Sequence, residues 1–214
     1  MLQATAPRSM PVQKSIVLEN IDWTTYSQLL HAFGRYPGIR LTYDRGQLEI
    51  MSPILRHDRD SRFLMRLIEA LTEELDLPLL PGGSTTLRRR VHQQGGEPDE
   101  CFWIANAARM AGRQRIDLRR DPPPDLAVEV DVSRSSLDRM GIFATLGIPE
   151  IWRLQGNKLT FHVRSADGKY RRAARSQSFP QISPTDLMPF IQAARKDGDQ
   201  NPLLRRFRKW VQGK

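Results

Sequence analysis

The chain has 214 residues, of which 39% are hydrophobic, and a formal net charge of +9 at pH 7, which is enough for one domain with its own core. The single cysteine, Cys101, excludes a disulfide within the chain, and no apolar run approaches the ~18 residues of a membrane-spanning helix. We therefore expect a soluble, cytoplasmic protein. The positive charge favours a polyanionic partner such as nucleic acid, although an arginine-rich solvated surface carries the same charge.

The start of the sequence predicts a flexible arm followed by a helix. Residues 1–15 contain prolines and no periodic apolar pattern, so we expect a loose arm there and a single domain over residues 16–214. Asp22 is a suitable N-cap for a helix whose apolar residues recur at helical spacing and end at Gly34.

The rest of the chain alternates between strand and helix patterns. Alternating apolar residues around a turn at residues 44–46 predict a hairpin, and residues 55–75 predict a long amphipathic helix. Short β-like runs follow at residues 85–91, 98–104, 125–132, 150–154, 158–163 and 169–173. Helical spacing returns at residues 137–146 and 185–194 and in a basic C-terminal helix, 202–212. These patterns predict an α/β or α+β domain in which helices flank a mixed sheet, preceded by the N-terminal helix and hairpin.

The run PPPDLAVEVDVSRSS places three acidic residues, Asp125, Glu129 and Asp131, in an apolar strand pattern. Side chains alternate faces along a strand, so the three acids share one face, with carboxylates two residues apart separated by roughly 6.5–7 Å. Such a face is stable either in water, as an ordinary solvated strand, or around a cation. The cation expected for hard oxygen ligands is Mg²⁺ or Mn²⁺.

A second acid for such a site is offered by the segment GGEPDECFWI. We interpret Gly95-Gly96 as a turn and Pro98 as the start of a strand, which leaves Asp99 where a neighbouring strand could meet Glu129. The alternative is an ordinary turn aspartate. The sequence contains neither a cluster of histidine and cysteine with zinc spacing nor a phosphate-binding glycine loop.

Three further residues are candidates for substrate contact. His57 stands at the start of the long helix, where it could instead cap the turn. Glu49 alternates with apolar residues in the hairpin and could face the acids or lie on the surface. Asp131 belongs to the acidic strand.

Several segments together resemble a known family. LTYDRGQLEIMSP, GGSTTLRR, GGEPDECFWI, IDLRRDPPPDLAVEVDVSRSSLD, ATLGIPEIWRL and LLRRFRKWV are similar to successive signatures of the Uma-type putative restriction endonuclease family, within the PD-(D/E)XK nuclease superfamily. The likeness runs from about Trp23 to Val211. It implies a restriction-endonuclease-like core, a metal-ion site and hydrolysis of DNA phosphodiester bonds.

The resemblance also implies roles for individual residues. Asp99 and Glu129 match the two metal-binding acids, and Asp125 is either a third ligand or a strand-opening residue. The superfamily's lysine would stand two positions after Glu129, but Asp131 is there, and the family's alternative place on the following helix holds Arg139. Arginine cannot act as a base, so Arg139 is expected to serve as a cationic helper, with a solvated helix residue as the alternative.

The sequence therefore predicts a DNA endonuclease that uses Mg²⁺ or Mn²⁺, acting as a homodimer by analogy with restriction enzymes. No lysine lies between Lys14 and Lys158. For that reason the alternative is a catalytically weak or inactive nuclease fold that binds DNA or regulates another activity.

Overall fold

Two β-sheets and the helices around them form a mixed α+β fold in the computed structural model, which describes residues 14–34, 36, 38–52, 55–131 and 137–214. The predicted arm lies outside the described residues except for its last two positions. These belong to strand β1 (Lys14–Leu18), which pairs with β3, so the arm prediction was wrong at that end. None of the helices in the described part of the chain combines the length and hydropathy that crossing a bilayer requires.

The first sheet is antiparallel and has the strand order β1-β3-β2-β6-β5. Its other members are β2 (Arg40–Asp44), β3 (Gln47–Ser52), β5 (Leu87–Arg89) and β6 (Gln94–Gly96). The predicted hairpin turn is confirmed, because Arg45 and Gly46 both have positive φ, 44° and 98°, as a two-residue type I′ turn requires.

Helix α1 (Trp23–Phe33) packs on this sheet through Tyr26. The predicted cap is confirmed: the Asp22 side chain accepts a hydrogen bond from the Thr25 N–H at 2.7 Å, and Gly34 ends the helix. A small cluster of buried apolar side chains joins the helix to β2 and β3.

The second sheet is mixed and has the order β11-β10-β9-β8-β7-β4. Its strands are β4 (Leu80–Pro81), β7 (Glu100–Trp103), β8 (Leu126–Asp131), β9 (Glu150–Gln155), β10 (Lys158–Arg164) and β11 (Tyr170–Ala173). Strands β8 and β9 are parallel, and the other described pairs are antiparallel. The chain crosses from β8 to β9 through α4 (Arg139–Leu146), which the left-handed Gly147, with φ 92°, ends as predicted.

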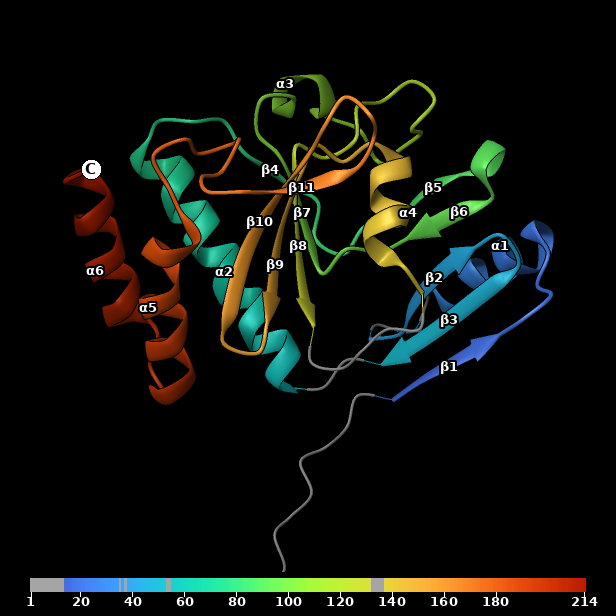
Figure 1. Cartoon of the computed structure of the whole chain (residues 1–214), viewed down its shortest axis with the longest axis horizontal. Helices are drawn as coiled ribbons and strands as arrows, with labels where there is room; N and C mark the ends of the chain where they lie inside the picture. The colour runs from blue at the N-terminus through green and yellow to red at the C-terminus, as the bar shows by residue number, and fades with distance from the viewer. Residues whose placement is uncertain (1–13, 35, 37, 53–54, 132–136) are drawn as a thin grey trace, which may run out of the picture.

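Helices cover both faces of the second sheet (Figure 1). On one face α2 (Leu55–Glu74), α5 (Pro184–Lys196) and α6 (Asn201–Gln212) share the largest apolar core with the sheet. On the other face α4 packs between this sheet and the first one. A short helix α3 (Ala107–Met110) and a 3₁₀ turn (Arg90–His92), neither of them predicted, occupy connections.

Strand β8 is buried on both faces, which excludes the solvated strand considered from its sequence. Leu126, Val128 and Val130 pack into the core beneath α2, whereas Ala127 faces the core beneath α4. Glu129 shares the face of Ala127 by alternation and is 3% exposed. Its carboxylate therefore lies in the protein interior.

The Gly95-Gly96 pair is not a turn, contrary to the sequence prediction, but forms the last two residues of β6, which lies between β2 and β5. The reason for glycine there is close packing. A Cβ atom at Gly95 would lie 2.4 Å from the Tyr26 hydroxyl oxygen and 3.0 Å from the Arg88 Cβ, and one at Gly96 would lie 3.3 Å from the Phe143 ring. Glycine pairs are common both in turns and in closely packed strands, so the sequence alone does not distinguish the two.

We predict that Gly95→Ala destabilises the fold by about 1–3 kcal/mol, as overpacking of a close contact typically does. Tyr26→Phe should be close to neutral, since the buried Tyr26 hydroxyl has no hydrogen-bond partner among the described residues, and should partly rescue Gly95→Ala. Denaturant unfolding measures both effects. Gly198→Ala, whose Cβ would meet nothing within 4 Å, is the control, and equal stabilities of the two alanine variants would contradict the packing argument.

Candidate functional site

A cluster of buried ionic side chains lies where the second sheet meets the first sheet and the start of α2. Strand β7 runs antiparallel to β8, with Glu100 opposite Val128, so the residue before β7 lies against the β8 backbone. The Asp99 N–H donates to the Val128 carbonyl at 3.1 Å, and the Val130 N–H donates to Asp99 Oδ2 at 2.7 Å. Asp99 is thus hydrogen-bonded to the residues on either side of Glu129.

Asp99 is also paired with a histidine and an arginine. His57 Nε2, from the first turn of α2, lies 3.0 Å from Asp99 Oδ2, and Arg40 Nη1, from β2, lies 3.0 Å from Oδ1. Burial would raise the pKa of Asp99, but the hydrogen bond and charge of His57 and the charge of Arg40 outweigh it and hold that pKa below its usual range. Asp99 therefore remains ionised at neutral pH.

His57 is 1% exposed and turns its ring toward Asp99. Burial lowers the pKa of His57, but the hydrogen bond and charge of Asp99 more than offset this and raise it above the ordinary value. His57 Nδ1 lies 3.3 Å from the Asp58 carboxylate. The side chain is accordingly arranged to orient Asp99.

Glu129 and Arg139 form a two-pronged buried ion pair. Arg139 Nε donates to Glu129 Oε2 at 2.8 Å, and Nη2 donates to Oε1 at 3.0 Å. The same guanidinium donates to the Thr42 hydroxyl of β2 at 3.0 Å and to the Glu97 carbonyl at 2.9 Å. Arg139 is 9% exposed, so it is not the solvated helix residue considered as an alternative. Burial raises the pKa of Glu129, while the charge of Arg139 opposes this.

Glu49 is buried in β3 opposite Thr42, which excludes the surface position considered for it. Burial lowers the pKa of Arg139, and the negative charge of Glu49 is among those that raise it. Two acids that flank Asp99 are buried as well. Glu97 accepts a 2.6 Å hydrogen bond from the Thr86 hydroxyl, Glu100 lies 3.7 Å from Arg62, and burial raises the pKa of both carboxyls.

The other two acids of the β8 segment are not part of this cluster. Asp125 precedes the strand, four residues from Glu129 or about 13 Å at roughly 3.3 Å per residue. Its carboxylate accepts hydrogen bonds from the Ile104 and Asn106 N–H groups and the Asn106 side chain at 2.6–2.9 Å, which fits the strand-opening role rather than that of a third ligand. Asp131 pairs with Arg153 of β9 at 2.6 Å.

Sequence reasoning missed Arg40, which contacts Asp99, and Thr42, which contacts Arg139. Both stand in the predicted hairpin strand at alternate positions, so they share a face. Their alternation indicates a shared face, but it does not indicate contact with the acids, because arginine and threonine have many roles on a half-buried strand.

The acid pair was tested for its fit to a divalent ion. Among the described residues no group of three or more histidine, cysteine, aspartate and glutamate side chains could hold a metal. Asp99 Oδ1, however, is a buried oxygen that accepts no hydrogen bond from the described residues, although its ion pair with Arg40 Nη1 is only 3.0 Å long. Mg²⁺ commonly takes only one or two carboxylates with water and phosphate as further ligands. The pair fits such an ion only when Arg139 releases one oxygen of Glu129 and Arg40 moves away from Asp99 Oδ1.

The comparisons with known proteins agree with this architecture. A crystal structure described as a putative nuclease belonging to DUF820 from Anabaena variabilis ATCC 29413 is similar over 71% of this chain and 90% of that chain, with a TM-score of 0.51 and 13% sequence identity. The fold is therefore that of a nuclease-like, mixed α+β protein. No curated protein matches the chain.

The family follows from the sequence itself. Residues 23–195 match the model of the Uma2 family, whose description is "Putative restriction endonuclease", and this match covers most of the chain. The protein belongs to the Uma2 family. The matched range includes Asp99, Glu129 and Arg139 and ends before α6.

We predict that His57 makes the stability of the protein depend on pH. Because the pKa of His57 is higher in the folded protein than in the unfolded chain, protonation of His57 stabilises the fold. This contribution is complete below the unfolded-state pKa of about 6.5 and is lost as pH rises through the folded-state pKa. The difference in melting temperature between wild type and His57→Gln should therefore be larger at about pH 5.5 than at about pH 9. A difference that stays constant across this range would contradict the charged His57–Asp99 pair.

We predict that Arg139→Met destabilises the fold by about 3–5 kcal/mol, because it leaves Glu129 buried without its cation. The double variant Glu129→Leu with Arg139→Met should recover part of that loss, since no unpaired charge remains. Chemical denaturation of both variants and of Glu129→Leu alone measures the coupling. Additive effects of the two substitutions would show that the pair is not coupled.

Proposed function

We propose that this protein is a metal-dependent DNA endonuclease in which Asp99 and Glu129 hold Mg²⁺ or Mn²⁺ and Arg139 assists as a cation. The observation that carries the proposal is the buried Asp99–Glu129 pair, joined through the hydrogen bonds of Asp99 to Val128 and Val130. Family membership supports a hydrolase acting on DNA, and a homodimer is the form proposed by analogy with restriction enzymes.

A divalent ion bound by these acids would lower the pKa of a water molecule and neutralise charge on phosphoryl oxygens. The chain's own residues prepare that chemistry. Asp99 stays ionised, and its Oδ1 forms an ion pair with Arg40 but accepts no hydrogen bond from the described residues. His57 and the Val130 N–H fix the other oxygen. The acid is thus oriented before any ligand arrives.

Arg139 can stabilise negative charge but cannot accept a proton from water. Burial lowers the pKa of Arg139, but the charge of Glu129 outweighs it and raises that pKa further above an already high value. When a phosphodiester enters, an Arg139 N–H group that donates to Glu129 can donate to a phosphoryl oxygen instead. The exchange is feasible because carboxylate and phosphoryl oxygens are anionic acceptors of similar geometry. The same exchange would free one Glu129 oxygen.

A second function is favoured by a specific observation. Both oxygens of Glu129 accept hydrogen bonds from Arg139, and arginine holds a carboxylate more rigidly than lysine does. If that pair does not open, the protein would bind DNA without cutting it and act as a nuclease-like binding module.

The two functions make different predictions for supercoiled plasmid DNA incubated with Mg²⁺ or Mn²⁺. For the endonuclease we expect nicking that falls at least ~100-fold in Asp99→Asn and Glu129→Gln, because each loses a ligand charge. Asp167→Asn, at an exposed acid paired with Arg171, is the matched control and should cut normally.

Binding of Mn²⁺, followed by electron paramagnetic resonance, provides a readout that does not depend on cutting. We expect Mn²⁺ binding in wild type and in the Asp167 control and its loss in the other two variants. DNA binding without nicking in either metal would support the binding module, and nicking that persists in both site variants would refute the proposed ligands.

A further inference from the structure

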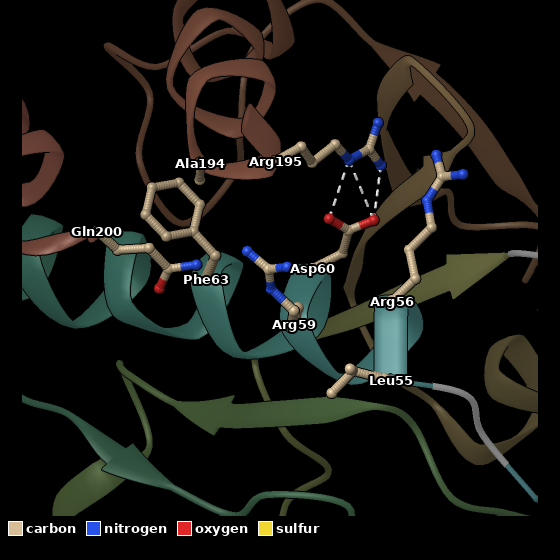
Figure 2. Close-up of a pocket in the computed structure, with 8 residues that line it drawn as sticks. All are labelled: Leu55, Arg56, Arg59, Asp60, Phe63, Ala194, Arg195 and Gln200. Atoms are coloured by element: carbon tan, nitrogen blue, oxygen red, sulfur yellow. Dashed lines mark hydrogen bonds and ion pairs between the residues drawn. The ribbon is translucent and has the colours of Figure 1, made fainter. Parts of the chain in front are cut away.

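A pocket of about 340 Å³ lies beside the first turns of α2, where the end of α5 and the start of α6 approach (Figure 2). Three arginines line it: Arg56 and Arg59 from α2 and Arg195 from α5. The acidic side chain in the lining is Asp60, so the pocket carries two more positive than negative charges. Leu55 and Phe63 supply an apolar part of its wall.

Arg195 is held in a fixed orientation at this pocket. Its Nε and Nη2 donate to the Asp60 carboxylate at 2.7–3.2 Å (Figure 2). Its Nη1 donates to the Asn157 side chain at 2.8 Å. A guanidinium has five N–H donors, and these contacts use three of them. Two N–H groups of an oriented arginine therefore remain for a further acceptor.

Arg56 and Arg59 are exposed and form no hydrogen bond or ion pair with any residue that the structure describes. They stand three residues apart on α2, and like charges at that spacing repel each other. Arg56 also lies in the first turn of the helix, where the helix dipole disfavours cations. A bound anion would relieve both effects.

The pocket lies next to the candidate site along the same helix. Arg56 precedes His57 in the sequence, so their Cα atoms are about 3.8 Å apart. The His57 side chain contacts Asp99. Figure 1 shows the start of α2, the turn between β9 and β10 and the end of β8 at the same edge of the molecule. The first turns of α2 thus carry His57 against Asp99 on their buried side and Arg56 and Arg59 on their exposed side.

We propose that this pocket binds a backbone phosphate of the DNA strand next to the phosphodiester held at Asp99 and Glu129. This inference rests on the proposed function, because it takes DNA as the ligand of the site. The phosphates of one strand recur every ~3.4 Å along the duplex, so neighbours of a cleaved phosphate are close to it. Arginine binds phosphate through paired N–H groups, and the set of three arginines offers these from two helices.

The test is the affinity of the full-length protein for a fluorescently labelled duplex of mixed sequence, measured by anisotropy in EDTA so that metal binding does not contribute. The double variant Arg56→Gln with Arg59→Gln removes two exposed charges and should leave the fold intact. We expect its dissociation constant to rise ~10-fold or more and the salt dependence, as the slope of log K against log salt, to fall by about 1–2.

The matched control is Arg205→Gln with Arg206→Gln, which removes two exposed arginine charges from helix α6 on the outside of the fold. It should change both quantities much less. Equal losses in the two double variants would overturn the pocket as a specific site, since only net charge would then matter. An unchanged affinity in the Arg56 and Arg59 variant would overturn it as well.

Two further measurements, plasmid nicking and competition by inorganic phosphate, distinguish this inference from the proposed function and from binding of free phosphate. If wild type nicks plasmid while the pocket variant binds duplex normally, the pocket proposal fails and the endonuclease stands. If wild type binds no duplex even at low salt, the proposed function fails too. Inorganic phosphate that competes with the duplex at micromolar concentration, in wild type but not in the pocket variant, would identify a free-phosphate site instead and overturn the DNA assignment.

Discussion

The buried ion pair between Glu129 and Arg139 is the interaction on which the arrangement of this molecule depends. Taking either charge out of water costs several kcal/mol, so the pair is stable only with close to complete hydrogen bonding. Arg139 achieves this by reaching β8, the Thr42 hydroxyl of β2 and the Glu97 carbonyl between β6 and β7. One guanidinium thereby links the second sheet, the first sheet and helix α4.

The same pairing sets the chemistry that the site can perform. Asp99 is neutralised by His57 and Arg40, and Glu129 by Arg139, so the acids are stable in the interior without an added ion. A substrate phosphate and a divalent ion would have to exchange places with these internal partners. In the function proposed above, stability and activity would therefore compete at Arg139.

Helix α2 contributes side chains both to the candidate site and to the arginine-lined pocket, because the side chains of its first turns point in different directions. His57 and Ser61 point toward Asp99 and Glu100, while Asp60 lies toward α5, where Arg195 holds it. Its apolar residues further along, such as Leu64 and Leu67, anchor the helix in the core. The rigid core therefore positions both sets of polar side chains.

The sequence by itself determined the features that depend on neighbouring residues: the Asp22 cap, the turn at Arg45 and Gly46, the amphipathic helices and the family. Local backbone preference and periodicity suffice for these. Asp99 and Glu129 were singled out by the strand pattern and by the family resemblance, and His57 and Arg139 were candidates as well, but their contacts with these acids were not predicted. Only the tertiary structure decided that Gly95 lies in a strand, that Asp125 opens one, and that Arg40 and Thr42 meet the acids. Those outcomes depend on contacts between residues tens of positions apart, which no local pattern encodes.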